Sequence, residues 1–387
     1  MTLRLRTIST IAEVPAHAWD ACANPAGRER NPFVAHGFLH ALETSGSATA
    51  ETGWQPVHLL LEDEAGSLRG AVPLYLKSHS YGEYVFDHAW ADAWHRAGGS
   101  YYPKLLAAVP FTPVTGPRLL VPPGPDAEGL AALLRDGLVA LAKRLGVETV
   151  HVNFPSAEES PVLTASGWLE RLGQQFHWFD RGYGTFDGFL AALSSDKRKN
   201  LRKERRKAAE SGLTFGWRTG HDLTEAAWDA FFACYMDTGS RKWGTPYLTR
   251  HFFSLLGTVM SNEVLLVTAE RDGRIIAGAL NLIGSHALFG RNWGAIEHHP
   301  FLHFELCYYQ AIDFALMHGL ARVEAGAQGE HKLARGYEPV VTRSLHWISH
   351  TGFRRAVSDY LHRERSAVAA EMLALEEFMP FRRADGH

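Results

Sequence analysis

Residues 287–326 read ALFGRNWGAIEHHPFLHFELCYYQAIDFALMHGLARVEAG. Residues 287–293, which begin with the apolar Ala287, Leu288 and Phe289, predict a strand, and residues 322–326 predict a second one. Between them, residues 302–318 carry apolar side chains at three- and four-residue steps, which predicts a helix with one face made of Leu306, Tyr309, Ile312 and Leu316. A strand–helix–strand unit of this kind requires two parallel strands.

The same order of elements occurs twice along the chain. Upstream of the quoted stretch, 264–271 and 274–283 predict a hairpin around the turn Asp272-Gly273. In the first half, the corresponding segments are a hairpin of 56–62 and 67–77, a strand 104–109, a helix 126–145 and a strand 147–154. The repeat is one of element order and not of sequence identity. It predicts two α/β domains, 1–181 and 182–387, each with a mixed sheet flanked by helices.

Composition agrees with a folded two-domain protein. The chain has 387 residues, of which 46% are hydrophobic and 21% charged. Its net charge of −3 means that any binding to nucleic acid or to an anionic membrane must be local. The three cysteines, Cys22, Cys234 and Cys307, have no zinc or disulfide spacing. With no signal peptide and no apolar run near the ~20 residues of a membrane span, we expect a cytoplasmic protein without a transmembrane segment.

Three regions carry a family likeness. They are 81–118 with its aromatic and proline-rich motifs, the basic stretch 194–206, and 303–337 with its two motifs HFELCYY and EAGAQGEHKLARGY. Together they resemble the Fem-like family labelled peptidoglycan biosynthesis or recognition, within the GNAT acyltransferase superfamily. The resemblance implies two tandem GNAT-like domains. It also implies that acyl donor and acceptor meet where the two parallel strands of a domain splay apart.

The resemblance further implies transfer of an acyl or aminoacyl group onto an amine, without a tightly bound cofactor. The amine belongs to a cell-wall precursor or a small metabolite, lipid-linked or free, and the co-substrate is aminoacyl-tRNA or acyl-CoA. GNAT sites for acyl-CoA usually carry Q/R-x-x-G-x-G/A at a helix start, where main-chain N–H groups bind pyrophosphate. Here Arg291 and Gly294 fit, but Ile296 takes the last position. This departure favours another donor, and acyl-CoA-dependent N-acetylation stays an alternative.

Candidate catalytic groups follow the second crossover. Transfer to an amine needs a base for the ammonium proton and donors for the carbonyl oxygen. Glu305, Glu330 and His331 are the candidate bases, and main-chain N–H groups of 291–294 are the candidate donors. An ion pair with a nearby cation is the structural alternative for Glu305. Further candidates for substrate binding lie in the same region, namely Arg291, Trp293, His303, Gln328 and Lys332.

Residues 186–211 predict a helix that ends before Gly212, and its part 195–211 is strongly basic. Like charges one turn apart repel, and a phosphate-rich partner would relieve that repulsion. A tRNA, a lipid pyrophosphate and an anionic membrane surface in peripheral contact all qualify, while solvation or pairing with acidic groups is the alternative. The candidate phosphate-binding residues are Arg198, Arg202, Lys203 and Arg206.

The first half has its own candidate pocket. Glu83 and Asp87 are four residues apart, so we expect them to share a helix face. There they could form an acid/base site, or they could equally hold Lys104 and Arg118. With them we group four more candidate substrate-binding residues, Trp90, Tyr102, Lys104 and Arg118. His299 and His303 lack a third ligand, so no metal site is predicted. A non-catalytic module that recognises an anionic wall precursor or nucleic acid remains the alternative of another class.

Overall fold

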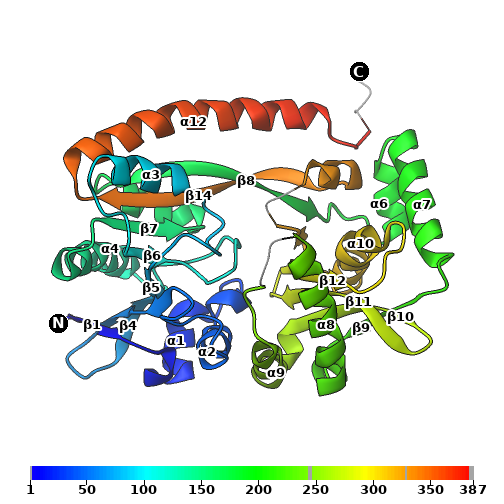
Figure 1. Ribbon diagram of the computed structural model, residues 1–387, viewed down its shortest axis with the longest axis horizontal. Coiled ribbons are helices and arrows are strands. Elements are labelled where there is room, and N and C mark those ends of the chain that lie inside the picture. Colours follow the sequence, from blue (N-terminus) through cyan, green and yellow to red (C-terminus); the bar gives the residue numbers. More distant parts are fainter. Residues whose placement is uncertain (1, 243–245, 327–328, 383–387) are drawn as a thin grey trace. The chain divides into compact units, whose positions relative to one another are not determined.

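The computed structural model describes residues 2–242, 246–326 and 329–382 (Figure 1). The chain forms two compact units. Unit 1 contains residues 1–173 and 341–370, and unit 2 contains residues 174–340 and 371–387. Three elements run from one unit into the other: β8 (Leu169–Phe179), β14 (Glu338–Ile348) and α12 (Thr351–Glu377). Among the described residues, no helix is both long and apolar enough to cross a membrane.

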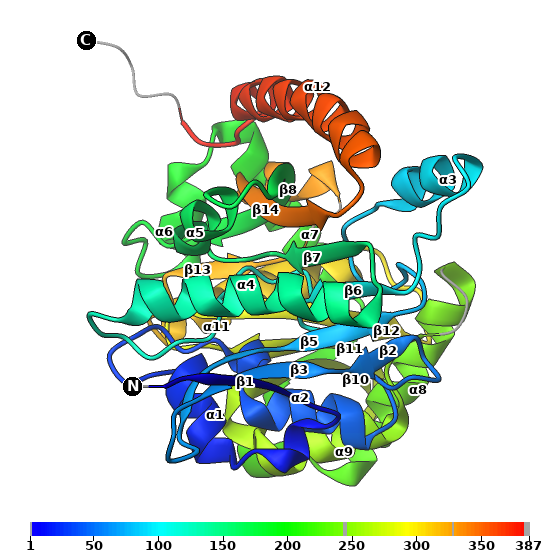
Figure 2. The ribbon, with the colours of Figure 1, turned by 90° about the vertical axis from the view of Figure 1, so that its left-hand side faces the viewer.

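Unit 1 contains the first predicted crossover. Strand β6 (Lys104–Ala107) pairs in parallel with β7 (Thr149–Asn153), and α4 (Ala127–Leu145) connects them. Figure 2 shows α4 lying along the strands that it contacts. Its buried face, with Leu130, Leu134, Leu138 and Leu141, packs in a core cluster of unit 1. Gly146 ends the helix in the left-handed conformation, as the sequence predicts.

The remaining elements of unit 1 extend two sheets. One has the order β1–β3–β4, and the other places β2, β5, β6, β7 and β14 side by side. The predicted strand 67–77 is in fact two strands, β4 and β5, because Pro73 between them has no N–H to continue a ladder. The bounds are β1 (Arg4–Ile8), β2 (Trp54–Pro56), β3 (His58–Glu62), β4 (Leu68–Val72), β5 (Leu74–Lys77), α1 (Ala16–Ala23), α2 (His36–Thr44), α3 (His88–Arg96) and α5 (Ser160–Thr164).

Unit 2 contains the second crossover. The hairpin β10 (Val264–Arg271) and β11 (Arg274–Ile283) has the predicted bounds, and β11 pairs with β12 (Ala287–Ala295). Strand β12 pairs in parallel with β13 (Arg322–Glu324), as the sequence requires. The strand order in this unit is β8–β13–β12–β11–β10–β9, with β9 at Thr214–Arg218.

The helices of unit 2 differ from prediction in two places. The expected helix 186–211 is two helices, α6 (Phe186–Ala192) and α7 (Ser195–Ala209). They are separated because Leu193 is extended, fully buried and bridged to Phe381. The expected helix 302–318 is α10 (Leu302–Phe304), a π-helical segment Glu305–Tyr309, and α11 (Gln310–Met317). The other helices are α8 (Glu225–Lys242) and α9 (Arg250–Val259).

Candidate active site

In unit 2 the parallel strands of the crossover separate. Pairing between β12 and β13 runs only from Ala287 opposite Arg322 to Phe289 opposite Glu324, where β13 ends. Strand β12 continues for six more residues, still paired with β11 on its other edge. Among the described residues, the β13 side of this continuation therefore has no partner strand, and we call this interval between the two strands the gap.

A β-bulge lies where the strands begin to separate. Asn292 pairs with Leu280 and Gly290 pairs with Asn281, so Arg291 is an extra residue in β12. Bulges bend a strand and redirect its main-chain and side-chain groups, and they are common next to active sites. Residues 291–294 thus lie in a strand and not at the start of a helix, which is where a pyrophosphate loop would place them.

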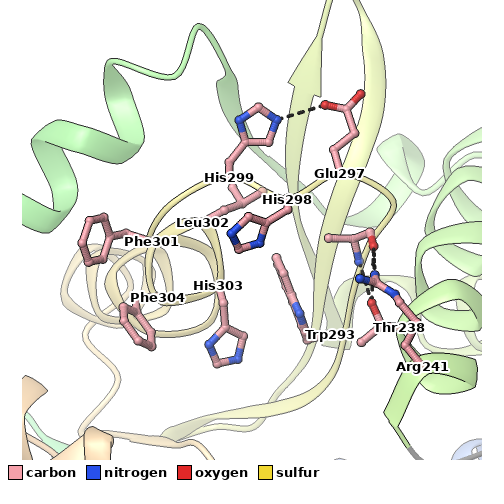
Figure 3. A pocket seen from close by; sticks show the side chains of 11 residues that line it. Thr238, Arg241, Trp293, Glu297, His298, His299, Phe301, Leu302, His303 and Phe304 are labelled. Atoms are coloured by element: carbon pink, nitrogen blue, oxygen red, sulfur yellow. Dashed lines mark hydrogen bonds and ion pairs between the residues drawn. The ribbon is translucent and has the colours of Figure 1, made fainter.

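A pocket of about 390 Å³ opens beside the end of β12 (Figure 3). Figure 3 shows the ring of Trp293 between His303 on one side and Thr238 and Arg241 of α8 on the other. The predicted residues Trp293 and His303 both line this pocket. Among the described residues, the lining consists of Thr238, Arg241, Trp293, Ala295, Glu297, His298, His299, Phe301, Leu302, His303 and Phe304.

Helix α8 holds one wall of the pocket in place. A Cβ atom on Gly294 would come within 2.3–2.4 Å of main-chain atoms of Cys234 and Tyr235, so only glycine permits this close approach. The Ala295 N–H donates to Thr238 Oγ1 at 3.0 Å, and Arg241 donates to the Ala295 carbonyl at 2.7 Å. These contacts fix the end of β12 against α8.

Opposite α8, His303 lines the pocket and links it to Tyr308 and His331, which are not part of the lining. The His303 ring lies 5.2 Å from Trp293, 5.4 Å from Tyr308 and 6.2 Å from His331, measured between centroids. The Tyr308 hydroxyl and His331 Nε2 are hydrogen-bonded at 2.9 Å. Burial and the neighbouring cations Arg335 and Lys332 lower the pKa of His331, so its imidazole is neutral near pH 7 and can accept a proton. Tyr308 belongs to the π-helical segment, a feature frequent at functional sites.

The carboxylate of Glu305, a predicted base, is already bonded to other side chains. It is buried and accepts hydrogen bonds from Arg205 at 3.0 Å and from Gln310 at 2.8 Å. Arg205 also pairs with Asp313 at 2.7 Å. The ion pair that the sequence leaves as the structural alternative for Glu305 is therefore present.

The remaining predicted residues of this region have different surroundings. Lys332 is buried, its Nζ donates to the Gly326 carbonyl at 2.9 Å, and burial lowers its pKa to about 8. Arg291 is half-buried at the bulge. Gln328 and the side chain of Glu330 lie outside the described part of the chain.

The basic helix α7 has two different faces. Leu201, Ala208 and Arg205 point inward, and Glu204 on the same side pairs with Arg335 at 2.8 Å. The outward face is formed by exposed cations, which are Lys199, Arg202, Lys203, Arg206 and Lys207. Of the four predicted phosphate-binding residues, three lie on this outward face. The fourth, Arg198, is half-buried and lies 3.4 Å from the Leu193 carbonyl that accepts from it.

In unit 1, Glu83 and Asp87 come together on Lys104. The expectation of a shared helix face is wrong, since both lie in the loop before α3, where Gly82 and Tyr84 have positive φ. Lys104 Nζ donates to Glu83 Oε2 at 2.8 Å, to Asp87 Oδ2 at 2.5 Å and to Ser80 Oγ at 2.8 Å. Glu83, Asp87 and Lys104 are all buried. The predicted Tyr102 joins them through its hydroxyl, 2.7 Å from Ser80 Oγ.

This cluster contains residues that the sequence did not single out. Lys77 is fully buried over the Trp54 ring, with its Nζ 3.9 Å from Glu83 Oε1. Burial raises the pKa of Glu83 to about 7 and lowers the pKa of Lys77 to about 7. The chain of hydrogen bonds continues from Asp87 through Tyr101 and His151 to His346.

Arg118 and Trp90 are the two remaining predicted substrate-binding residues of unit 1. The Arg118 guanidinium is fully buried and donates to the carbonyls of Val114, Gly116, Pro117 and Asn153. Glu159 accepts from the main-chain N–H of Arg118 at 2.7 Å. Trp90 packs edge-on to His346, at 4.9 Å between ring centroids. Among the described residues of both units, no group of three side chains is placed to bind a metal ion.

Comparison with solved structures defines the class of fold. FemX is 11% identical, with 92% of this chain and 100% of FemX covered and a TM-score of 0.55. L-PGS from Bacillus licheniformis is also 11% identical, with 92% and 99% covered and a TM-score of 0.52. A tandem GNAT protein from the clavulanic acid biosynthesis pathway is 13% identical, with 90% and 99% covered and a TM-score of 0.48. The chain has the tandem GNAT-like α/β fold that the sequence predicts.

The sequence itself gives the family. Residues 10–383 match the model of the FemAB-like family, described as peptidoglycan biosynthesis/recognition, and the chain belongs to this family. No curated protein matches the chain. Family and fold together support a transferase that acts on amines.

Proposed function

We propose that unit 2 transfers an acyl or aminoacyl group onto an amine bound in the pocket beside β12. The observation that carries this proposal is the opening of the β12–β13 pair at the Arg291 bulge, next to that pocket. Main-chain N–H groups in the gap can donate to the carbonyl oxygen of the donor as negative charge develops on it. The amine attacks the carbonyl carbon, and the bond from that carbon to the donor's oxygen or sulfur breaks.

The corresponding region of unit 1 is filled, and this contrast supports unit 2 as the catalytic half. Pairing of β6 with β7 covers Leu105–Ala107, and a further parallel bridge joins Gly116 to Pro155 beyond the strands. The segment that holds Arg118 and its carbonyl partners occupies the region after β6. A donor would have to displace these buried contacts in order to bind there.

We propose His331 as the base. Its neutral imidazole accepts the ammonium proton of the substrate, directly or through the hydroxyl of Tyr308, and passes it to solvent. The attacking nitrogen loses a second proton as the amide forms, and this proton leaves on the oxygen or sulfur of the donor. His303 lies between this pair and the pocket and contacts the substrate. Glu330 is a second proposed base, and Glu305 acts by holding Arg205 and α7 against the crossover.

For the donor we propose aminoacyl-tRNA, with acyl-CoA as the alternative, and for the acceptor an amine of a cell-wall precursor, free or lipid-linked. The family description and the missing small residue at Ile296 both favour this choice. We further propose that Arg202, Lys203 and Arg206 bind phosphate groups of a substrate, because they are exposed on one face of α7.

Turnover tests the proposal. The full chain is given charged tRNAs and, separately, acyl-CoAs, each with cell-wall peptide amines, and products are identified by mass. His331→Gln should lower kcat about 10²- to 10⁴-fold, as expected for loss of a general base. His221→Gln, which changes an exposed histidine elsewhere in unit 2, should leave the rate unchanged. Full activity of His331→Gln would exclude this base, and binding without product for every donor would identify a recognition module instead.

A further inference from the structure

The outward face of α7 carries a strip of mostly positive charge, with the exposed acids Asp196 near its start and Glu210 at its end. At 100° per residue, Lys199, Arg202, Lys203, Arg206 and Lys207 span about 140° of the helix circumference. In the described part of the chain, its only ion pairs are Arg202 with Asp187 at 3.3 Å and Arg206 with Glu210 at 3.6 Å. All four of these side chains are more than half exposed, so each pair contributes little. The strip therefore keeps most of its charge for a partner.

Exposed apolar side chains lie at the end of α12, next to the start of α7. The Ser194 N–H donates to the Pro380 carbonyl at 2.8 Å, and Leu193 is bridged to Phe381, so the two segments are held together within unit 2 (Figure 1). Met379 and Phe381 pack against the core of unit 2, whereas Leu373 is 65% and Phe378 67% exposed. Such large apolar side chains gain no burial inside the chain.

We propose that this part of unit 2 docks on an anionic lipid bilayer. The cationic strip lies against lipid phosphates, and Leu373 and Phe378 enter the boundary between headgroups and acyl chains. An RNA partner would satisfy the cations but would leave the aliphatic Leu373 without a matching surface. This inference rests on the proposed binding of phosphate by α7, and it specifies the source of that phosphate.

Vesicle binding by the full-length protein provides the test. Co-sedimentation is measured with phosphatidylglycerol–phosphatidylcholine vesicles and with pure phosphatidylcholine vesicles. We expect binding only to the anionic vesicles, weakening as salt is added. Lys199→Gln/Lys203→Gln/Lys207→Gln should weaken it about a hundredfold, since each cation near an anionic surface is worth about fivefold. Leu373→Ser/Phe378→Ser should weaken it about tenfold or more through lost apolar burial.

Unit 1 offers a matched control. Lys143→Gln/Arg144→Gln removes two exposed cations beside the exposed Leu145, at the end of α4. This variant should bind anionic vesicles like the wild type, and equal losses in both charge variants would overturn the assignment to α7. Unchanged vesicle binding in Leu373→Ser/Phe378→Ser would also overturn the proposal. If uncharged tRNA binds through the α7 cations while vesicles do not, phosphate binding stands and the bilayer is refuted. If neither binds, both proposals fail.

Discussion

Replacing Lys104 with methionine removes the only positive charge within hydrogen-bonding distance of Glu83 and Asp87 among the described residues. The two buried carboxylates already have one oxygen each without a hydrogen-bond partner, Glu83 Oε1 and Asp87 Oδ1. Breaking a buried ion pair by removing one partner typically costs about 3–5 kcal/mol, since the other charge stays buried. For a unit of this size that corresponds to a fall in Tm of roughly 6–20 °C.

The loss should depend on pH. Burial raises the pKa of Glu83 to about 7 even with Lys104 present, and losing the cation raises it further. A carboxyl group whose folded pKa is raised stabilises the fold below its unfolded pKa, near 4.5 for Glu, and loses that contribution as pH rises through the folded value. Lys104→Met should therefore lie furthest below the wild type at pH 8, and the difference should shrink toward pH 5.

The assay is urea unfolding followed by circular dichroism at both pH values. Lys104→Met/Glu83→Gln/Asp87→Asn removes these three buried charges together, while Lys77 can lose its own charge because burial lowers its pKa to about 7. The triple variant should recover at least half of the lost free energy of unfolding. Lys143→Met, on the exposed side of α4, serves as the control and should change stability by less than about 0.5 kcal/mol. A Lys104→Met protein within 1 kcal/mol of the wild type at pH 8, or a difference that does not depend on pH, would refute this reasoning.

Three further predictions concern unit 2. Gly294→Ala should lower the free energy of unfolding by about 1–3 kcal/mol, because the new Cβ meets the α8 main chain. The control Gly129→Ala has open space around the new Cβ and should not lower the free energy of unfolding. Urea unfolding of the two variants measures the difference. Arg205→Met should cost about 2–3 kcal/mol by leaving Glu305 and Asp313 unpaired, while Lys207→Met on the outward face of the same helix should be neutral within about 0.5 kcal/mol. Since the pKa of His331 is lowered, the kcat/KM profile should reach half of its maximum below pH 6.5, and a half-maximum above pH 7 would contradict its role as base.

Local patterns predicted the elements best. The hairpin β10–β11 agrees with prediction to the residue because Asp272 and Gly273 both adopt the positive φ that a tight two-residue turn needs. The two crossovers followed from apolar periodicity, and their parallel pairing followed from chain geometry. Two predicted elements are each divided in the structure, at Pro73 and at Leu193. The division at Pro73 could be predicted from the proline itself. The division at Leu193 could not, because it depends on pairing with Phe381, nearly 190 residues away.

The candidate sites were less predictable because their partners are distant in sequence. The prediction that Glu83 and Asp87 could hold Lys104 is confirmed, but the predicted helix face is wrong, since a loop brings the carboxylates to the lysine. His151 and His346 meet across 195 residues, and no local pattern indicates that contact. The division of α7 into two faces did have a signal. Leu201 and Ala208 are seven residues apart and mark the inward side of an otherwise polar helix.

The two crossovers show how one arrangement of elements can serve two purposes. In both units the parallel pair spans three residues, but in unit 2 a bulge then redirects β12, and a pocket lies at its end. In unit 1 the corresponding region is filled by Arg118 and its carbonyl partners, and the titratable groups are buried around Lys104. Catalysis needs a place that a substrate can reach, and stability needs polar groups that are already bonded to one another. This contrast between the two crossovers is the reason why we propose unit 2 as the half that performs the chemistry.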